Sequence, residues 1–297
     1  MAKKWFVMLS WQGCSVILCV IAAICTVLAR KNGRTLPITQ LMVTYSILCV
    51  KSLCGGAISG IPWGRYFILA VLNFAGDISM IYAYTLTSLS SSMLLATTVI
   101  FWVAPLSYFV FGRVLSWQQV FSIFMCFFGV FMIFLSDGAG DSRLIGNLVA
   151  VFSAICYSIA NIMQEALVHE ASTKEYLFGF TMCITPLSII GAVFIEWQPI
   201  INYNWNMTAV CLILSYSVLL AVYYLIVPYI MLYSNATEMN ISFLSSNFLS
   251  LGVSIIAFGQ KASWLYLVGF IFVPIAIVIF SMYPVKEYDL IESAECK

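Results

Sequence analysis

The chain has 297 residues, of which 63% are hydrophobic and 8% are charged, and its formal net charge is +1. Soluble domains carry about 25% charged residues, so this composition excludes a soluble globular domain, and the near-zero charge offers no basic surface for nucleic acid. Several uncharged stretches are long enough to hold a membrane span of about 20 residues. These stretches lack the alternating pattern of a membrane barrel, so we expect an all-α integral membrane protein.

Charged residues, prolines and glycines divide the chain into ten expected transmembrane helices. In chain order these are residues 5–29, 37–60, 65–86, 90–111, 118–136, 144–168, 176–196, 208–232, 239–258 and 264–283. The first span follows Met-Ala-Lys-Lys without a cleavage site, so we interpret it as a retained helix rather than a signal peptide. Ten spans place both termini on one side, and the Lys and Arg count favours the cytosol. The first loop, with Arg30, Lys31 and Arg34 outside, argues against that orientation.

A short internal repeat indicates that five helices are duplicated. Residues 111–117 and 258–264 share the pattern Phe-Gly-x-x-x-Ser-Trp and join the fourth to the fifth span of each half. Coincidence is the alternative, because these residue types favour membrane interfaces. Duplication of five spans gives two inverted repeats, as in many secondary transporters. We therefore expect a first repeat over residues 1–140 and a second over 141–297 with a short cytosolic tail, together forming one transport domain.

Three ionisable residues, Lys51, Asp77 and Glu165, fall inside expected spans. Such residues are costly in lipid and normally face a bundle interior or a wet cavity. Glu165 shares a helix face with Ser158 and Asn161, at spacings of seven and four residues. This polar stripe either lines a solute path, bonds a neighbouring helix, or brings Glu165 to the cytosolic interface.

Asp77 forms a second polar stripe with Asn73 and Tyr84. The carboxyl group is either protonated by burial, and able to carry a proton, or ionised by pairing with Lys51. The long side chain of Lys51 can also reach the membrane interface, which would make its role structural.

Hydroxyl-rich segments occupy the fourth and ninth spans, at residues 85–98 and 240–250. Small hydroxyl residues allow helices to approach closely. The other interpretation is that Thr98, Ser245 and Asn247 line a polar cavity. Together with the two stripes, these residues complete a predicted substrate-binding set.

Three groups of residues carry a resemblance to a known family. They are Ala83-Tyr84-Thr85 with Ser88 and Leu94-Leu95; Gly146-Asn147-Leu148 with Tyr157, Asn161, Gln164 and Glu165; and Ala236-Thr237 with Asn240, Leu244 and Ser250. Over about residues 5–284 the chain resembles the drug/metabolite transporter superfamily, and within it the F-type members of solute carrier family 35, which are nucleotide-sugar-transporter-like. The resemblance implies ten helices, an inverted repeat, cytosolic termini and a central cavity. Where animal F-type proteins usually carry acidic residues, this chain has Asn73, Ala75, Ala96 and Asn247.

The function expected from these observations is secondary transport of a small organic solute by alternating access. The resemblance suggests a nucleobase-, nucleoside- or nucleotide-related solute, and the alternative is a non-transporting scaffold or sensor of the same fold. An enzyme is not expected, because His169 is the one histidine, Asp77 lacks a second aspartate in another span, and no ATP-binding loop is found. We expect no cofactor, metal or nucleic-acid partner. The expected partners are the lipid bilayer and a small-molecule substrate, with a homodimer left open, in the Golgi, another endomembrane or the plasma membrane.

Overall fold

The computed structural model describes residues 2–54, 60–111, 113–114, 116–137, 141–234, 236–259, 263–282 and 286–287. Their first half contains α1 (Ala2–Asn32), α2 (Pro37–Leu53), α3 (Trp63–Leu86), α4 (Leu89–Ala96), α5 (Val99–Phe111) and α6 (Trp117–Asp137). The second half contains α7 (Asp141–Glu170), α8 (Thr173–Phe194), α9 (Trp197–Ile201), α10 (Met207–Met231), α11 (Ala236–Ser242), α12 (Leu244–Ile256) and α13 (Trp264–Met282). Two short strands, β1 (Arg113–Val114) and β2 (Lys286–Glu287), pair antiparallel with Arg113 opposite Glu287.

Each of the ten predicted spans coincides with one helix or with an interrupted pair of helices. The fourth span is divided into α4 and α5 and the ninth into α11 and α12, and neither interruption was predicted. Among the described residues, six segments are long and apolar enough to cross a bilayer by length and composition: Leu9–Asn32, Trp63–Leu86, Leu89–Val110, Arg143–Glu170, Thr173–Phe194 and Met207–Met231. The expectation of an all-α membrane chain is therefore confirmed.

The predicted boundary between the halves falls where α7 begins, at Asp141. Both copies of the repeated pattern run partly through residues outside the described set, and each ends on the first residue of a helix, Trp117 of α6 and Trp264 of α13. The second predicted span, 37–60, extends beyond α2, which ends at Leu53; residues 55–59 are outside the described set.

Local capping explains several helix ends. Ser172 and Glu175 form a reciprocal capping box at the start of α8. The N-cap residue of α2, Leu36, has no side-chain hydrogen bond, and the buried carboxylate of Glu196 accepts instead from the backbone N–H groups of Ile38 at 2.9 Å and Thr39 at 2.7 Å. This contact ties the start of α2 to the end of α8, and the same two helices pack together.

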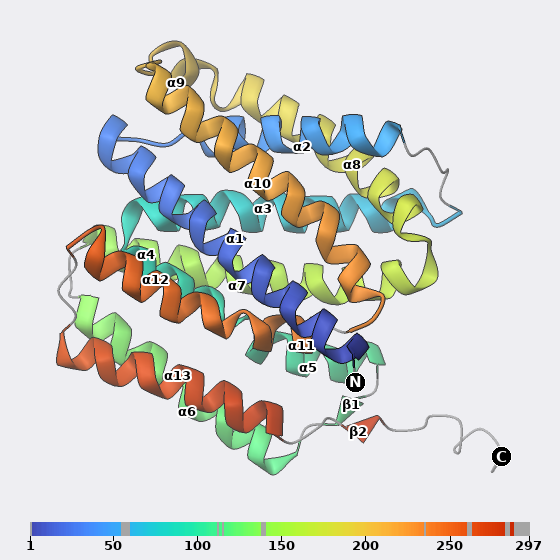
Figure 1. The fold of residues 1–297 in the computed structure, drawn as a ribbon, viewed down its shortest axis with the longest axis vertical. Helices are drawn as coiled ribbons and strands as arrows, with labels where there is room; N and C mark the ends of the chain where they lie inside the picture. Colours follow the sequence, from blue (N-terminus) through green and yellow to red (C-terminus); the bar gives the residue numbers. More distant parts are fainter. Residues whose placement is uncertain are drawn as a thin grey trace.

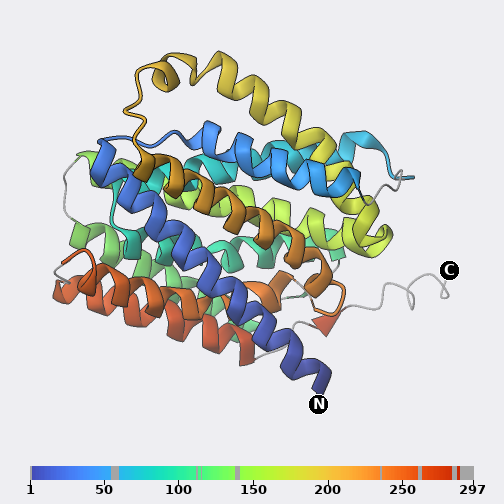
Figure 2. The ribbon, with the colours of Figure 1, turned by 45° about the horizontal axis from the view of Figure 1, so that its top comes forward.

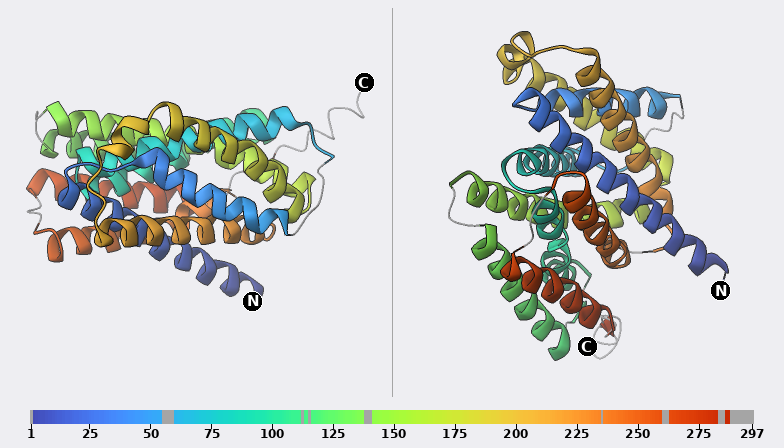
Figure 3. Two further views of the ribbon diagram at one scale, coloured as in Figure 1. Left: turned by 90° about the horizontal axis from the view of Figure 1, so that it is seen from above. Right: turned by 60° about the vertical axis from the view of Figure 1, so that its left-hand side comes forward.

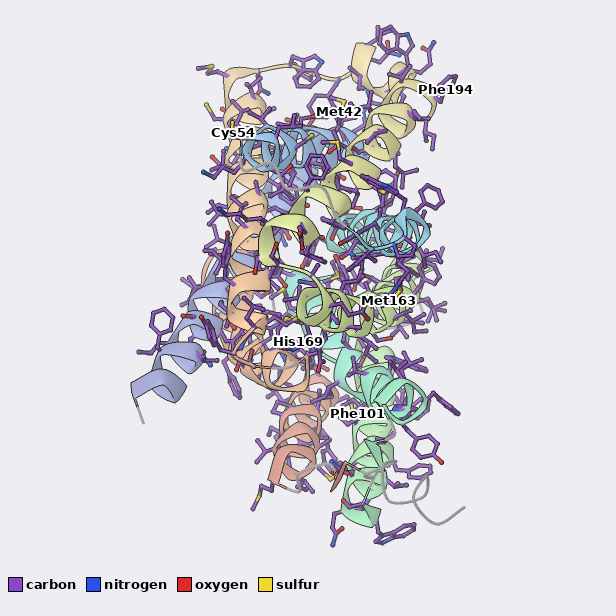
Figure 4. The ribbon with its side chains drawn as sticks, turned by 90° about the vertical axis from the view of Figure 1, so that its right-hand side faces the viewer. Met42, Cys54, Phe101, Met163, His169 and Phe194 are labelled. Atoms are coloured by element: carbon purple, nitrogen blue, oxygen red, sulfur yellow. The ribbon has the colours of Figure 1, made fainter. Side chains whose placement is uncertain are left out.

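The helices lie side by side in a flattened bundle (Figure 1). Helices α6 and α13 pack together along one edge, and α8 with α9 lies at the opposite edge, as Figures 2 and 3 show from other directions. Figure 4 views α2 and α3 nearly end-on, from the end at which α7 finishes, marked by His169. At this end Arg65 of α3 makes a bidentate ion pair with Glu170 of α7.

The largest buried apolar cluster joins α1, α2, α3, α4, α7, α8 and α10. Glycines permit the closest approaches, since a Cβ added at Gly179 of α8 would lie 2.7 Å from the ring of Tyr66. The outer surface carries exposed large apolar side chains, among them Phe109, Phe194 and Ile256. Soluble monomers rarely expose such a surface, whereas lipid accepts it.

Candidate functional site

A cavity of about 120 Å³ lies between the two halves of the chain. Its walls come from α1, α3, α4, α5, α7, α10, α11, α12 and the two helix interruptions. The lining residues are Leu18, Asn73, Asp77, Met80, Tyr84, Met93, Ala96, Thr97, Val99, Tyr157, Asn161, Gln164, Leu220, Tyr223, Tyr224, Val227, Asn240, Phe243 and Ser246. We call this space the central cavity.

Asp77 supplies the one carboxylate among the lining residues of the central cavity that the structure describes. Only 4% of the residue is exposed, and it accepts hydrogen bonds from three tyrosine hydroxyls on three other helices. Tyr157 of α7 donates to Oδ1 at 2.5 Å, and Tyr224 of α10 donates to Oδ2 at 2.8 Å. Tyr45 of α2 also donates to Oδ2. We call these three side chains the tyrosine clamp.

The approach of α7 to α3 positions the clamp. A Cβ at Gly76 would lie 2.9 Å from Cε1 of Tyr157, so glycine is needed for the ring to reach Asp77. One turn earlier on α7, Ser153 donates to the carbonyl of Gly76 at 2.8 Å. The small residues bring the helix backbones together, as is common between membrane helices.

Amide side chains supply the remaining polar surface of the central cavity. Asn73 donates to the carbonyl of Leu69 on its own helix at 3.0 Å, and Asn240 donates to that of Ala236 at 2.7 Å. The side chains of Asn161 and Gln164 line the cavity without a hydrogen bond to another described residue. An amide is both donor and acceptor, so these two groups can recognise a polar solute.

The two interrupted helices meet at the cavity. Thr97, between α4 and α5, accepts a hydrogen bond from Nδ2 of Asn247 on α12 at 3.1 Å. The hydroxyls of Thr97 and Ser246 also donate to carbonyls three residues earlier in their own helices, at 2.7 and 2.5 Å. Ser and Thr side chains can satisfy carbonyls that an interruption leaves without a helical partner. The hydroxyl-rich segments therefore permit irregular backbone beside the cavity.

The predicted substrate-binding residues divide into two groups. Asn73, Asp77, Tyr84 and Asn161 line the central cavity, and Asn247 touches it through Thr97. The remaining four, Lys51, Thr98, Glu165 and Ser245, are not among the lining residues described.

Each of these four has a different position. Lys51 is exposed near the end of α2, and the partners of Asp77 are tyrosines rather than this lysine. Thr98 lines a small separate cavity and donates to the carbonyl of Leu95. Glu165 is buried, and its carboxylate accepts from the backbone N–H of Ala236 at 3.1 Å, which caps the start of α11. The side chain of Ser245 is outside the described set.

The tyrosine clamp and Gln164 were missed as site residues. A signal existed, because a tyrosine in the middle of an apolar span needs a partner for its hydroxyl. Tyr157, Asn161 and Gln164 also lie at helical spacing on one face. Nothing in the sequence pairs Tyr45 or Tyr224 with Asp77, since those contacts span 32 and 147 residues.

The groups that line the central cavity can bind a small molecule. Among the described residues, no three His, Cys, Asp or Glu side chains gather to form a metal site. Aromatic rings, amides and one carboxylate can stack against and hydrogen-bond a small molecule. These groups come from helices of both halves of the chain.

Comparison with known proteins agrees with this architecture. The chain resembles solute carrier family 35 member F2 of Mus musculus, with 23% identity over 95% of this chain and 80% of that protein. An uncharacterized solute carrier family 35 member of Schizosaccharomyces pombe is 24% identical over 74% of this chain and 45% of its own length. A solved crystal structure shares the fold with a TM-score of 0.64 and 14% identity, over 93% of this chain and 96% of the other.

The family model of the F-type proteins, described as solute carrier family 35, matches residues 1–282. This match covers nearly the whole chain and includes the residues of the central cavity. The earlier resemblance is thus confirmed, and the apolar helices agree with a multi-pass membrane protein. The chain belongs to solute carrier family 35 and is a solute transporter in the general sense of that family.

Proposed function

We propose that the chain is a secondary transporter that carries a small organic solute across the membrane by alternating access. The observation that carries this proposal is the central cavity, which both halves line and which holds Asp77 within the tyrosine clamp. Secondary transporters of the inverted-repeat type place their binding site at such an interface, near the middle of the bilayer.

The proposed architecture is ten spans in two inverted five-helix repeats. The correspondence pairs α1 with α7, α2 with α8, α3 with α10, the interrupted pair α4–α5 with α11–α12, and α6 with α13. Exchanging the halves converts the observed α1–α10 contact into α7–α3, α2–α10 into α8–α3, and α1–α12 into α7–α5, and all of these contacts occur. The contact α4–α12 converts into α11–α5, which also occurs, and α2–α8 and α6–α13 convert into themselves. A two-fold relation between the halves accounts for this pattern.

The lining supports a solute with a flat ring and polar edges. Tyr84, Tyr157, Tyr223, Tyr224 and Phe243 supply aromatic surface, and the amides of the central cavity supply donors and acceptors. The volume of about 120 Å³ favours a solute of nucleobase size over a nucleotide sugar. Asp77 would accept a hydrogen bond from an N–H or O–H of the solute.

The tyrosine clamp suggests how binding couples to movement. Asp77 and Tyr45 belong to the first half, whereas Tyr157 and Tyr224 belong to the second. A solute that donates to Asp77 competes with the hydroxyls that tie the halves together. Binding would then change the relative stability of conformations that differ in the arrangement of the halves, which is what alternating access requires.

The test is uptake into proteoliposomes of labelled nucleobases, nucleosides and nucleotide sugars. Asp77→Asn should reduce saturable uptake, whereas Lys51→Gln, which also removes a charge but lies outside the cavity lining, should leave it unchanged. If folded wild-type protein takes up none of these solutes, the proposed substrate class is wrong. If a wider solute panel also gives no uptake, the non-transporting scaffold or sensor is favoured.

A further inference from the structure

A second, larger cavity of about 770 Å³ opens at the end of the bundle where α1 and α3 finish and α4 and α7 begin. Its walls include three arginines, Arg30, Arg34 and Arg143, and the hydroxyl residues Thr85, Thr87 and Ser88. We call it the arginine vestibule, and we propose that it binds a phosphate-bearing anion. Arginine is suited to this ligand because its planar fork matches two phosphate oxygens.

Neutral groups hold two of the guanidinium groups in place. Arg30 lies over the ring of Phe258, 4.3 Å from its centroid, and its Nη1 donates to the carbonyl of that residue at 3.4 Å. Nη2 of Arg34 donates to the carbonyl of Asn202 at 2.5 Å. Within the described part of the chain, neither side chain forms an ion pair with a carboxylate. Each therefore keeps its positive charge and further N–H donors for a ligand.

The sign of the electric field in the vestibule is set by the arginines. Helices α1 and α3 end here and α4 and α7 begin here, so the partial charges at helix ends offset one another. No Asp or Glu occurs among the vestibule residues that the structure describes. The vestibule thus attracts anions, whereas the central cavity contains the carboxylate of Asp77.

One residue lines both spaces. Tyr84 lines both the arginine vestibule and the central cavity, and its hydroxyl donates to Sδ of Met93 at 3.3 Å. An anion in the vestibule would therefore bind close to the central cavity. This inference does not depend on the proposed transport function.

The phosphate group bound in the arginine vestibule can belong to a soluble anion or to a lipid headgroup. To distinguish them, the full chain is placed in phosphatidylcholine nanodiscs and titrated calorimetrically with inorganic pyrophosphate. Arg30→Gln and Arg34→Gln should each weaken binding about tenfold or more, the loss expected for one charge-assisted contact. Lys31→Gln removes the same charge from an exposed neighbour outside the vestibule lining and should bind as wild type does.

In the second arm, nanodiscs contain phosphatidic acid and no pyrophosphate, and thermal unfolding is measured. If pyrophosphate binds and the arginine substitutions weaken its binding, the ligand is a soluble anion. If only phosphatidic acid stabilises the protein and the arginine substitutions remove that effect, the ligand is a lipid phosphate. Either result supports the site. Should Arg34→Gln fail to fold, Arg34→Lys keeps the charge and loses the fork, and it should bind more weakly. The proposal is overturned if neither probe has an arginine-dependent effect, or if Lys31→Gln weakens binding as much as Arg34→Gln.

Discussion

Replacing Asp77 by asparagine separates the charge of this residue from its structural contacts. Oδ2 accepts from Tyr45 and Tyr224, and Oδ1 accepts from Tyr157. An asparagine with its carbonyl oxygen at the Oδ2 position keeps the first two hydrogen bonds. Its amide group can then donate to the hydroxyl oxygen of Tyr157, whose proton rotates away. The shape and the number of contacts are retained, and the negative charge is lost.

The expected cost in stability follows from the hydrogen bonds of the tyrosine clamp. Hydrogen bonds to a charged group contribute about 1.5–3 kcal/mol, against about 0.5–1.5 kcal/mol for neutral pairs. Changing three charged hydrogen bonds into neutral ones lowers the free energy of unfolding by about 3 kcal/mol in total. Removing a buried charge offsets part of this loss. Asp77→Ala is far more damaging, because it leaves three buried hydroxyls unpaired at about 1–3 kcal/mol each. Asp77→Asn is therefore the variant that should fold.

Transport should respond more strongly than folding. Loss of one charged contact to the solute corresponds to about a tenfold or greater drop in uptake. The measurements are thermal unfolding in detergent and initial rates in proteoliposomes, made on the same preparation. A folded Asp77→Asn protein with wild-type rate and saturation would refute the assignment of Asp77 to the solute site and leave it as a structural cross-link.

Two further substitutions test the packing around the central cavity. Gly76→Ala should lower the free energy of unfolding by about 1–3 kcal/mol, because the new Cβ meets the ring of Tyr157 at 2.9 Å. The control Gly13→Ala should not destabilise the protein, because no atom lies within 4 Å of its added Cβ. Equal melting temperatures for the two variants would contradict the close packing at Gly76. Thr97→Val should lower the free energy of unfolding, followed by thermal unfolding, by about 1–3 kcal/mol, because it leaves the buried amide of Asn247 without its partner. Replacing both Thr97 and Asn247 by apolar residues should lower it by less than the sum of the two single changes.

The sequence predicted the helical segments well because the signal is physical and local. Long uncharged stretches must become helices in lipid, and each predicted span holds a helix. The interruptions at Thr97 and Phe243 were not predicted, since no proline lies at either point. The backbone turns there because hydroxyl groups and contacts between distant helices compensate for the lost helical hydrogen bonds, and such contacts leave no trace in a local pattern.

The candidate site was only partly predictable for a related reason. An ionisable residue in an apolar span is conspicuous, so Asp77 was found. Its partners are tyrosines, and no local pattern pairs Tyr45 or Tyr224 with Asp77, because those contacts span 32 and 147 residues. Glu165 gave the same signal as Asp77, yet its carboxylate accepts from the backbone of Ala236 instead of lining the cavity. Only the packing of α7 against α11 distinguishes the two roles.

The most direct test of the transport mechanism is counterflow in proteoliposomes, once a transported solute is identified. Vesicles are loaded with unlabelled solute and diluted into a trace of labelled solute, and accumulation of label is followed with time. Alternating access through the central cavity predicts a transient accumulation above equilibrium in wild type, which Asp77→Asn diminishes and Lys51→Gln preserves. Label that only equilibrates without overshoot, or an overshoot that Asp77→Asn leaves intact, would contradict a carrier that binds its solute at Asp77.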